Sequence, residues 1–187
     1  GTRQTIAIGL AATALGLVPM LLLGVEDQYW LLWPSFLVIG FALEVALVEL
    51  SGTKHDLPHT IGGVRVEGKG PRLEVRQPHA HAKVLGVTRG ATKTEAAAAV
   101  DAAVAAAPAW RDMAFDDRAA ILLKAADLLA GPWRAKINAA TMLGQSKTAY
   151  QAEIDAACEL IDFWRFNVHF ARQIIAEQPP ANSRGLW

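Results

Sequence analysis

The sequence AATMLGQSKTAYQAEIDAACELIDFWRFNVHF, from Ala139 to Phe170, decides the fold of the chain around it. Apolar residues recur at steps of three and four, which predicts an amphipathic helix with one buried face. Gly144-Gln145-Ser146 interrupts the pattern, so the long helix begins after this tripeptide. Acidic residues crowd its first half and Arg165 and Arg172 its second, an order that suits the helix dipole. The predicted apolar face consists of Ile154, Ala157, Cys158, Leu160 and Ile161.

Three shorter helices are predicted upstream of this one. The first begins with a capping box, in which Thr92 is the N-cap and Glu95 reaches back to it, and Pro108 is expected to end it after an alanine-rich run. The second begins at Asp116 or Asp117 and ends at Gly131-Pro132, and the third runs from about residue 132 to residue 143. The predicted buried face of the second helix consists of Ile121, Leu122, Ala125, Leu128 and Leu129.

Short alternating runs between glycine and proline turns predict a small β part before these helices. The three expected strands are Val64–Val66, Arg72–Arg76 and Lys83–Thr88.

The first 52 residues are apolar enough to predict a membrane segment. Thr5 to Val25 carries no charge, and its 21 residues would form a helix of about 31 Å, the thickness of a bilayer core. A second apolar stretch, Trp30 to Leu50, follows a four-residue connection, so we expect a transmembrane helical hairpin in residues 1–52, in contact with lipid through residues 5–50. Its Glu44 is expected to snorkel or to pair within the hairpin, with a proton path as the alternative. The positive-inside rule then places residues 53–187 on the cytoplasmic side. The alternative is a buried helical pair in a soluble protein.

Charge and cysteine content exclude some classes of protein. The formal net charge is zero, and the basic residues Arg65, Lys69, Arg72 and Arg76 have no aromatic residues between them, so no nucleic-acid partner is expected. A single cysteine excludes an internal disulfide.

The segment TMLGQSKTAYQAEIDAACELIDFWRFN resembles the N-terminal helical part of the delta-1-pyrroline-5-carboxylate dehydrogenases, a branch of the aldehyde dehydrogenase superfamily. Asp116 to Arg134, DDRAAILLKAADLLAGPWR, is similar to the same family at the expected distance, and the resemblance covers roughly residues 56–187. The chain starts at Gly1 and not at Met, and it ends at Trp187 without a closing signal, so we expect a piece of a longer protein. The predicted fold is mainly α with a small β part: a transmembrane hairpin, and in residues 53–187 the incomplete N-terminal β and helical portion of an aldehyde dehydrogenase NAD-binding domain.

The resemblance implies the chemistry of the intact enzyme. A cysteine thiolate attacks the aldehyde of glutamate γ-semialdehyde, NAD accepts the hydride, and a glutamate-activated water releases glutamate. The cysteine and the glutamate of this family lie in late loops that this sequence does not contain. We therefore expect the chain alone to be inactive, to bind no cofactor by itself, and to associate as a homo-oligomer or with a partner protein. The alternative is a non-enzymatic, membrane-anchored helical module that binds partners.

Glu153 is the one candidate site residue. By resemblance, the glutamate of QAEIDA lies near the aldehyde channel, where it would shape or gate the pocket without performing the chemistry. From the residues alone it is a helix carboxylate, either solvated or paired. Cys158 is expected to pack in the apolar face, because no histidine or helix N-terminus lies beside it to lower its pKa. His55, His59, His79 and His81 are candidate metal ligands, but no clear carboxylate or cysteine completes a site, so no metal is expected.

Overall fold

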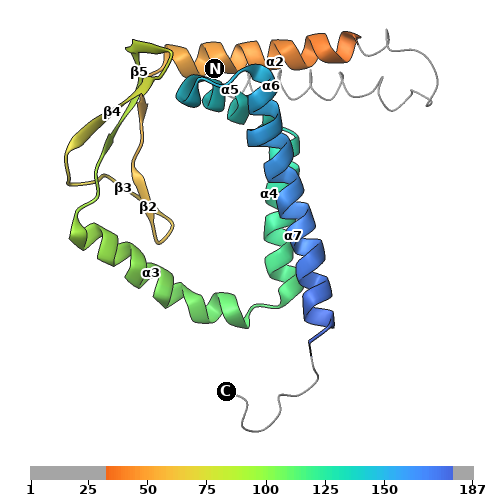
Figure 1. The fold of residues 1–187 in the computed structure, drawn as a ribbon. Helices are drawn as coiled ribbons and strands as arrows, with labels where there is room; N and C mark the ends of the chain where they lie inside the picture. The colour runs from red at the N-terminus through yellow and green to blue at the C-terminus, as the bar shows by residue number, and fades with distance from the viewer. Residues whose placement is uncertain (1–32, 179–187) are drawn as a thin grey trace.

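The computed structural model describes residues 33–178, with side chains from Leu37 onward. The strands and the helix α3 occupy one side of the molecule, whereas α4 and α7 lie side by side on the other, beneath α2 (Figure 1). In chain order, the elements are α2 (Trp33–Gly52), β1 (His55–Asp56), β2 (His59–Ile61), β3 (Val64–Val66), β4 (Arg72–Gln77), β5 (Ala80–Arg89), α3 (Lys93–Asp112), α4 (Phe115–Ala130), α5 (Arg134–Gln145), α6 (Ala149–Ala152), the π-helical segment η2 (Glu153–Cys158) and α7 (Glu159–Ala176).

The described strands form two small sheets. In the first, β5 lies between β4, its antiparallel hairpin partner, and β1, to which it is parallel. In the second, β2 and β3 form a hairpin whose turn, Gly62-Gly63, has positive φ at both residues (58° and 80°), a conformation that glycine adopts without strain. The three predicted strands are present, and β1 and β2, which were not predicted, are only two and three residues long.

Helix α3 begins as its sequence predicts and ends later. The Thr92 hydroxyl accepts a hydrogen bond from the Glu95 backbone N–H at 3.3 Å, and the Glu95 carboxylate accepts one from the Thr92 N–H at 2.8 Å, so the capping box is confirmed. The prediction that Pro108 ends the helix is wrong, because α3 continues to Asp112. A proline removes one backbone hydrogen bond, but the chain can resume helical geometry after it.

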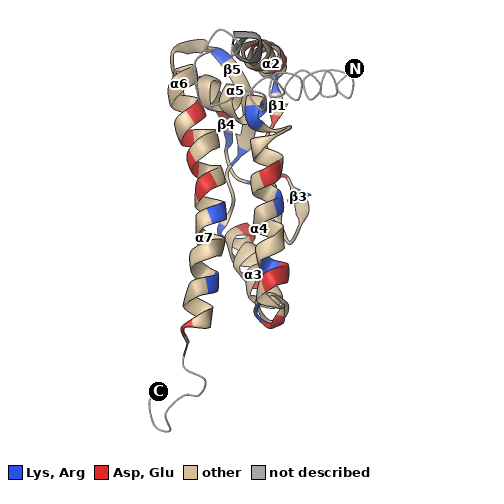
Figure 2. Ribbon diagram, turned by 90° about the vertical axis from the view of Figure 1, so that its right-hand side faces the viewer, with Lys and Arg blue, Asp and Glu red and all other residues tan. Residues whose placement is uncertain are grey.

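The contact between α4 and α7 holds the main apolar core. Ala126 and Leu129 of α4 meet Ala157, in η2 just before α7, and Ile161 of α7, and these four side chains are at most 7% exposed. Alanine at two of the four positions lets the two helix backbones approach closely. Exposed ion pairs, Arg165–Asp127 and Arg172–Asp116, flank this contact, and on α7 the acidic residues precede the basic ones (Figure 2).

The predicted buried face of α4 is only partly correct. Leu129 is buried, but Ile121 is 51% exposed, and Leu122 and Leu128 are 38% and 39% exposed. Within residues 33–178, α4 packs mainly on α7, which covers a narrow stripe through Ala119, Ala126 and Leu129, narrower than the periodicity indicated.

The break at Gly144-Gln145-Ser146 is confirmed. Helix α5 ends at Gln145, and Ser146 adopts the left-handed conformation with φ 58°. A second capping box, between Thr148 and Gln151, then starts α6. The helix that follows is continuous to Ala176, but its residues 153–158 are π-helical, which the sequence did not indicate.

The predicted transmembrane hairpin is wrong. Its second helix corresponds to α2, which packs against α5, and Ala42 and Ala46, four residues apart on α2, are buried. In the part of the chain that the structure describes, no helix has both the length and the apolar character that crossing a bilayer requires. That finding overturns the predicted fold class in its membrane part and the predicted membrane location with residues 53–187 on the cytoplasmic side. The first expected span, residues 5–25, lies outside the described residues, and the division at residue 52 stays a prediction.

Candidate functional site

Glu153 lies at the centre of a polar cluster between α5 and η2. Its Oε1 accepts hydrogen bonds from both Arg134 Nε, at 2.8 Å, and Arg134 Nη2, and its Oε2 accepts one from Asn138 Nδ2 at 2.5 Å. The Arg134 and Glu153 side chains are 30% and 35% exposed, whereas Asn138 is 5% exposed. The sequence left open whether Glu153 is solvated or paired, and the structure shows that it is paired.

The surroundings of Glu153 keep its carboxyl group ionised. Burial acts to raise its pKa, but the hydrogen bonds from Arg134 and Asn138 together outweigh burial, and the pKa lies below the ordinary value. The hydrogen bonds that Arg134 donates to Glu153 in turn raise the pKa of the Arg134 guanidinium. The pair therefore consists of two opposite charges that stabilise each other.

Cys158 belongs to the same cluster. Its Sγ lies 3.2 Å from Arg134 Nη2 and 3.6 Å from Glu153 Oε1. Burial raises the pKa of the Cys158 thiol; Arg134 opposes this effect, and Glu153 adds to it. A thiol with a raised pKa is a poor nucleophile at neutral pH. The geometry thus gives Cys158 a polar contact with Arg134, which sequence spacing did not reveal, but not the environment of a catalytic thiolate.

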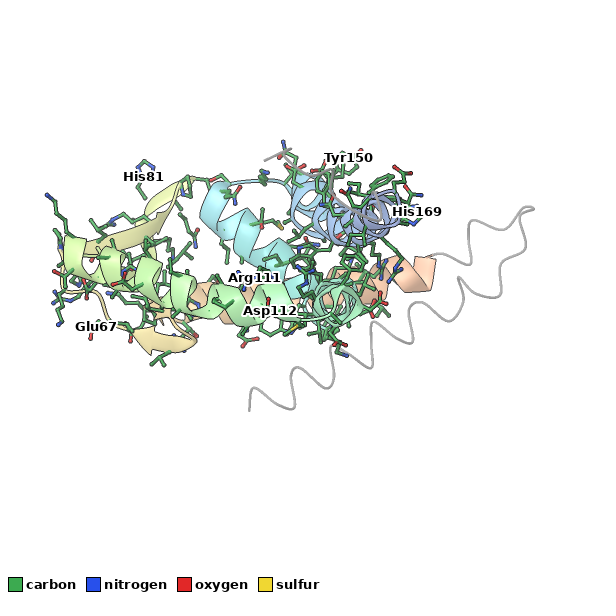
Figure 3. All side chains as sticks on the ribbon, turned by 90° about the horizontal axis from the view of Figure 1, so that it is seen from below. Glu67, His81, Arg111, Asp112, Tyr150 and His169 are labelled. Atoms are coloured by element: carbon green, nitrogen blue, oxygen red, sulfur yellow. The ribbon has the colours of Figure 1, made fainter. Side chains whose placement is uncertain are left out.

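The four candidate histidines are distributed over different contacts. His55 and His59 bond through Nε2 to the backbone oxygens of Leu50 and Arg89, at 3.1 and 2.8 Å. His79 bonds through Nδ1 to Ser146 Oγ at 2.8 Å, and His81 points away from the molecule (Figure 3). Among residues 33–178, no three histidine, cysteine or acidic side chains gather where a metal ion could bind.

A concave region separate from the Glu153 cluster lies beside β1 and β5, with a volume of about 450 Å³. Lys54, Arg72 and Arg89 line it together with Asp56 and Glu67, and Arg89 pairs with Glu67 at 3.4 Å. The two acidic residues offset most of the charge of the three basic ones. None of the residues of the Glu153 cluster lines this region.

The turn from β5 into α3 is occupied by a carboxylate of the chain itself. Phosphates of a dinucleotide cofactor bind where a strand turns into a helix N-terminus. The turn from β5 into α3 instead holds the Glu95 carboxylate, which accepts hydrogen bonds from the backbone N–H groups of Thr92 and Lys69 and would repel a phosphate. The parallel pair β1–β5 joins only two residues of each strand, and the chain between them passes through β2, β3 and β4.

The sequence model described as "Aldehyde dehydrogenase family" matches residues 65–185, which include the whole Glu153 cluster. The chain belongs to the aldehyde dehydrogenase family. Among relatives within this family, the delta-1-pyrroline-5-carboxylate dehydrogenase of Agaricus bisporus is 42% identical over 146 residues, 78% of this chain and 27% of the relative. The mitochondrial enzyme of Homo sapiens with the same name is 44% identical over 138 residues, 74% of this chain and 24% of the relative. The chain spans about a quarter of the length of the curated relatives it matches.

Solved structures of the aldehyde dehydrogenase family agree with this fold. The delta-pyrroline-5-carboxylate dehydrogenase of Mycobacterium tuberculosis, bound with NAD and cobalamin, matches with a TM-score of 0.74 and 58% identity, over 80% of this chain and 28% of that one. The Thermus 1-pyrroline-5-carboxylate dehydrogenase with bound NAD matches with a TM-score of 0.64 and 26% identity, over 88% of this chain and 29% of that one. Residues 53–187 make up less than 80% of this chain, so both structural matches must include residues before 53. That extent does not support an unrelated membrane segment at the front of the chain.

Proposed function

We propose that this chain is the N-terminal part of an NAD-dependent dehydrogenase that oxidises L-glutamate γ-semialdehyde to glutamate in proline catabolism. The observation that carries the proposal is the consistent identity of the relatives: those from a fungus and a human and the two bacterial structures are all named pyrroline-5-carboxylate dehydrogenases. Glu153, by its position in QAEIDA, is the residue of this chain that we assign to the wall of the aldehyde channel.

The chain's own chemistry limits what it does without the rest of the enzyme. Cys158 is its only cysteine and has a raised pKa, so the segment supplies no thiolate nucleophile. Its turn from β5 into α3 holds the Glu95 carboxylate, which would repel the phosphates of NAD. In this proposal the segment supplies packing surface and Glu153, and the complete enzyme supplies the nucleophile and the cofactor site.

Two proteins are compared to test this proposal. The complete dehydrogenase that carries this segment and the 187-residue chain are each incubated with NAD and glutamate γ-semialdehyde, and NADH formation is followed by absorbance. We expect turnover by the complete protein, a lower rate with propionaldehyde, and no turnover by the 187-residue chain. Robust NADH formation by the short chain, or a complete protein that does not oxidise glutamate γ-semialdehyde, would overturn the proposal.

A second candidate, a non-enzymatic helical module that binds partner proteins, is favoured by one observation. Phe163, Phe166, Phe170 and Ile174 follow one another along α7 at helical spacing, and each is more than half exposed. Tyr150 of α6 is 76% exposed and points outward, as does His169 (Figure 3). Limited proteolysis of the complete protein separates the two candidates: an independent module leaves a resistant core that ends near residues 92 and 176, whereas part of a larger domain leaves a resistant fragment that extends beyond residue 176.

A further inference from the structure

The π-helical segment η2 changes which residues share a face of the helix. In an α-helix of 3.6 residues per turn, two residues five apart point about 140° away from each other. A π-helix bonds residues five apart, and the N–H of Glu159 here donates to the carbonyl of Ile154. Glu153 and Cys158, also five apart, consequently point to the same side and meet one guanidinium, that of Arg134.

The groups that hold Glu153 come from one face of α5. Arg134 and Asn138 are four residues apart, so their side chains lie one above the other. Arg134 binds Oε1 and Asn138 binds Oε2, which means that each carboxylate oxygen has its own donor on the same helix. The carboxylate cannot rotate without losing one of these bonds.

The Asn138 amide donates its hydrogen bond to Glu153 although its own oxygen is left without a partner. Its Oδ1 is buried and has no hydrogen-bond partner among the described residues. Turning the amide over would direct Oδ1 at the Glu153 carboxylate and replace an attraction by a repulsion. A buried acceptor without a partner costs stability, so this orientation is held by the need to bind the Glu153 carboxylate.

We propose that Arg134 and Asn138 are positioning residues that, together with η2, fix the Glu153 carboxylate in one orientation for aldehyde substrates. This inference rests on the proposed function, because only that function assigns Glu153 to the wall of the aldehyde channel. Glu153 performs no bond-making step, so misplacing it impairs substrate binding more than the chemistry that follows. The effect falls on KM before kcat.

The first test measures the cluster in the 187-residue chain and needs no activity. Cys158 is the only cysteine, so the pH at which its reaction with a chromogenic aromatic disulfide reaches half its maximal rate reports the pKa of this thiol. Arg134→Gln removes the cation beside the thiol and should raise this pH. Glu153→Gln removes the neighbouring anion and should lower it. Lys136→Gln, a matched loss of charge on the same helix from a residue that instead faces the ring of Trp133, should leave it unchanged.

Two outcomes of the thiol titration decide on the cluster. Shifts of opposite sign in Arg134→Gln and Glu153→Gln, with Arg134→Lys closer to the unaltered chain than Arg134→Gln, support the arrangement. Shifts of the same sign, or a shift in Lys136→Gln as large as that in Arg134→Gln, overturn it, because they indicate general loosening of the helices.

The second test uses the complete dehydrogenase. We expect Arg134→Gln to raise KM for glutamate γ-semialdehyde on the order of tenfold, the loss typical of a hydrogen bond to a charged group, with a much smaller change in kcat. Arg134→Lys should recover part of the loss, and Lys136→Gln should behave as the unaltered enzyme. An unchanged KM in Arg134→Gln overturns the positioning role while the proposed function stands. A complete protein that does not oxidise this aldehyde overturns the proposed function and with it the purpose assigned to the cluster, whose geometry the thiol titration judges separately.

Discussion

Replacing Ile161 with alanine tests the packing of α7 against α4. Ile161 is 4% exposed and lies in the core cluster with Ala126, Leu129 and Ala157. The substitution removes three buried carbon atoms, at about 0.8 kcal/mol each, and leaves a cavity that adds to the loss. Because two of the neighbours are alanines on helix backbones, little can move in to fill the space. The expected loss of unfolding free energy is about 3–4 kcal/mol.

The matched control is Ile121→Ala on α4. The same atoms are removed, but Ile121 is 51% exposed, so we expect a loss below about 1 kcal/mol. Urea unfolding followed by circular dichroism gives both free energies. In thermal unfolding, Ile161→Ala should lower Tm by roughly 6–16 °C for a domain of this size. If Ile121→Ala costs as much as Ile161→Ala, the wide apolar face that the sequence predicted for α4 is the buried one, and the assignment of the core is refuted.

Three further changes are expected to alter stability, each measured by urea unfolding. Thr92→Ala removes the N-cap of α3 and should cost about 1 kcal/mol, whereas Thr94→Ala, an exposed threonine two residues on, should cost less; equal losses would contradict the role of the cap. Gly86→Ala places a Cβ 2.6 Å from the His55 backbone oxygen and should cost about 1–3 kcal/mol, because it forces β1 away from β5. The control Gly144→Ala meets nothing within 4 Å and should cost no stability. If Gly86→Ala leaves the unfolding free energy unchanged, β1 does not lie against β5. The folded-state pKa of Glu153 lies below its ordinary value of 4.5. Its contribution to stability is therefore complete above about pH 4.5 and is lost as the pH falls through the lowered value. Glu153→Gln should weaken the decrease of the unfolding free energy at acidic pH, and an unchanged decrease would refute the pairing.

Local signals in the sequence predicted the ends of several helices correctly. Thr92 and Glu95 are three residues apart, and their capping box depends on nothing outside the first turn of α3. The break at Ser146 likewise follows from a short polar stretch after an apolar pattern. Such features are set within a few residues, and neighbouring elements rarely override them.

One local signal failed, because α3 continues past Pro108, but the other wrong predictions concern what a helix packs against. The apolar residues of α2 are the same whether lipid or a protein helix covers them, and hydropathy alone does not identify the partner. The structure shows that α2 packs against α5, and that Ala42 and Ala46 of α2 are buried. Ile121 fits a helical stripe equally well, but it is 51% exposed in the structure.

The residues around Glu153 could not be predicted from the sequence for a related reason. Arg134 and Asn138 precede Glu153 by 19 and 15 residues, and they reach it only because α5 and η2 pack together. A π-helical turn has no reliable residue signature, so the shared orientation of Glu153 and Cys158 was also hidden. The resemblance singled out Glu153 but not the groups that hold it.

The core and the Glu153 cluster share one short segment, and this ties the stability of the fold to the geometry of the site. Ala157 is fully buried against α4, and it lies in η2 between Glu153 and Cys158. The contact of Ala157 with α4 fixes how η2 is rotated about its axis, and that rotation directs Glu153 and Cys158 at Arg134. A larger side chain at Ala157 would push η2 away from α4 and displace the Glu153 carboxylate from both of its donors at once. The six residues of η2 therefore set both the packing against α4 and the orientation of the Glu153 carboxylate toward α5.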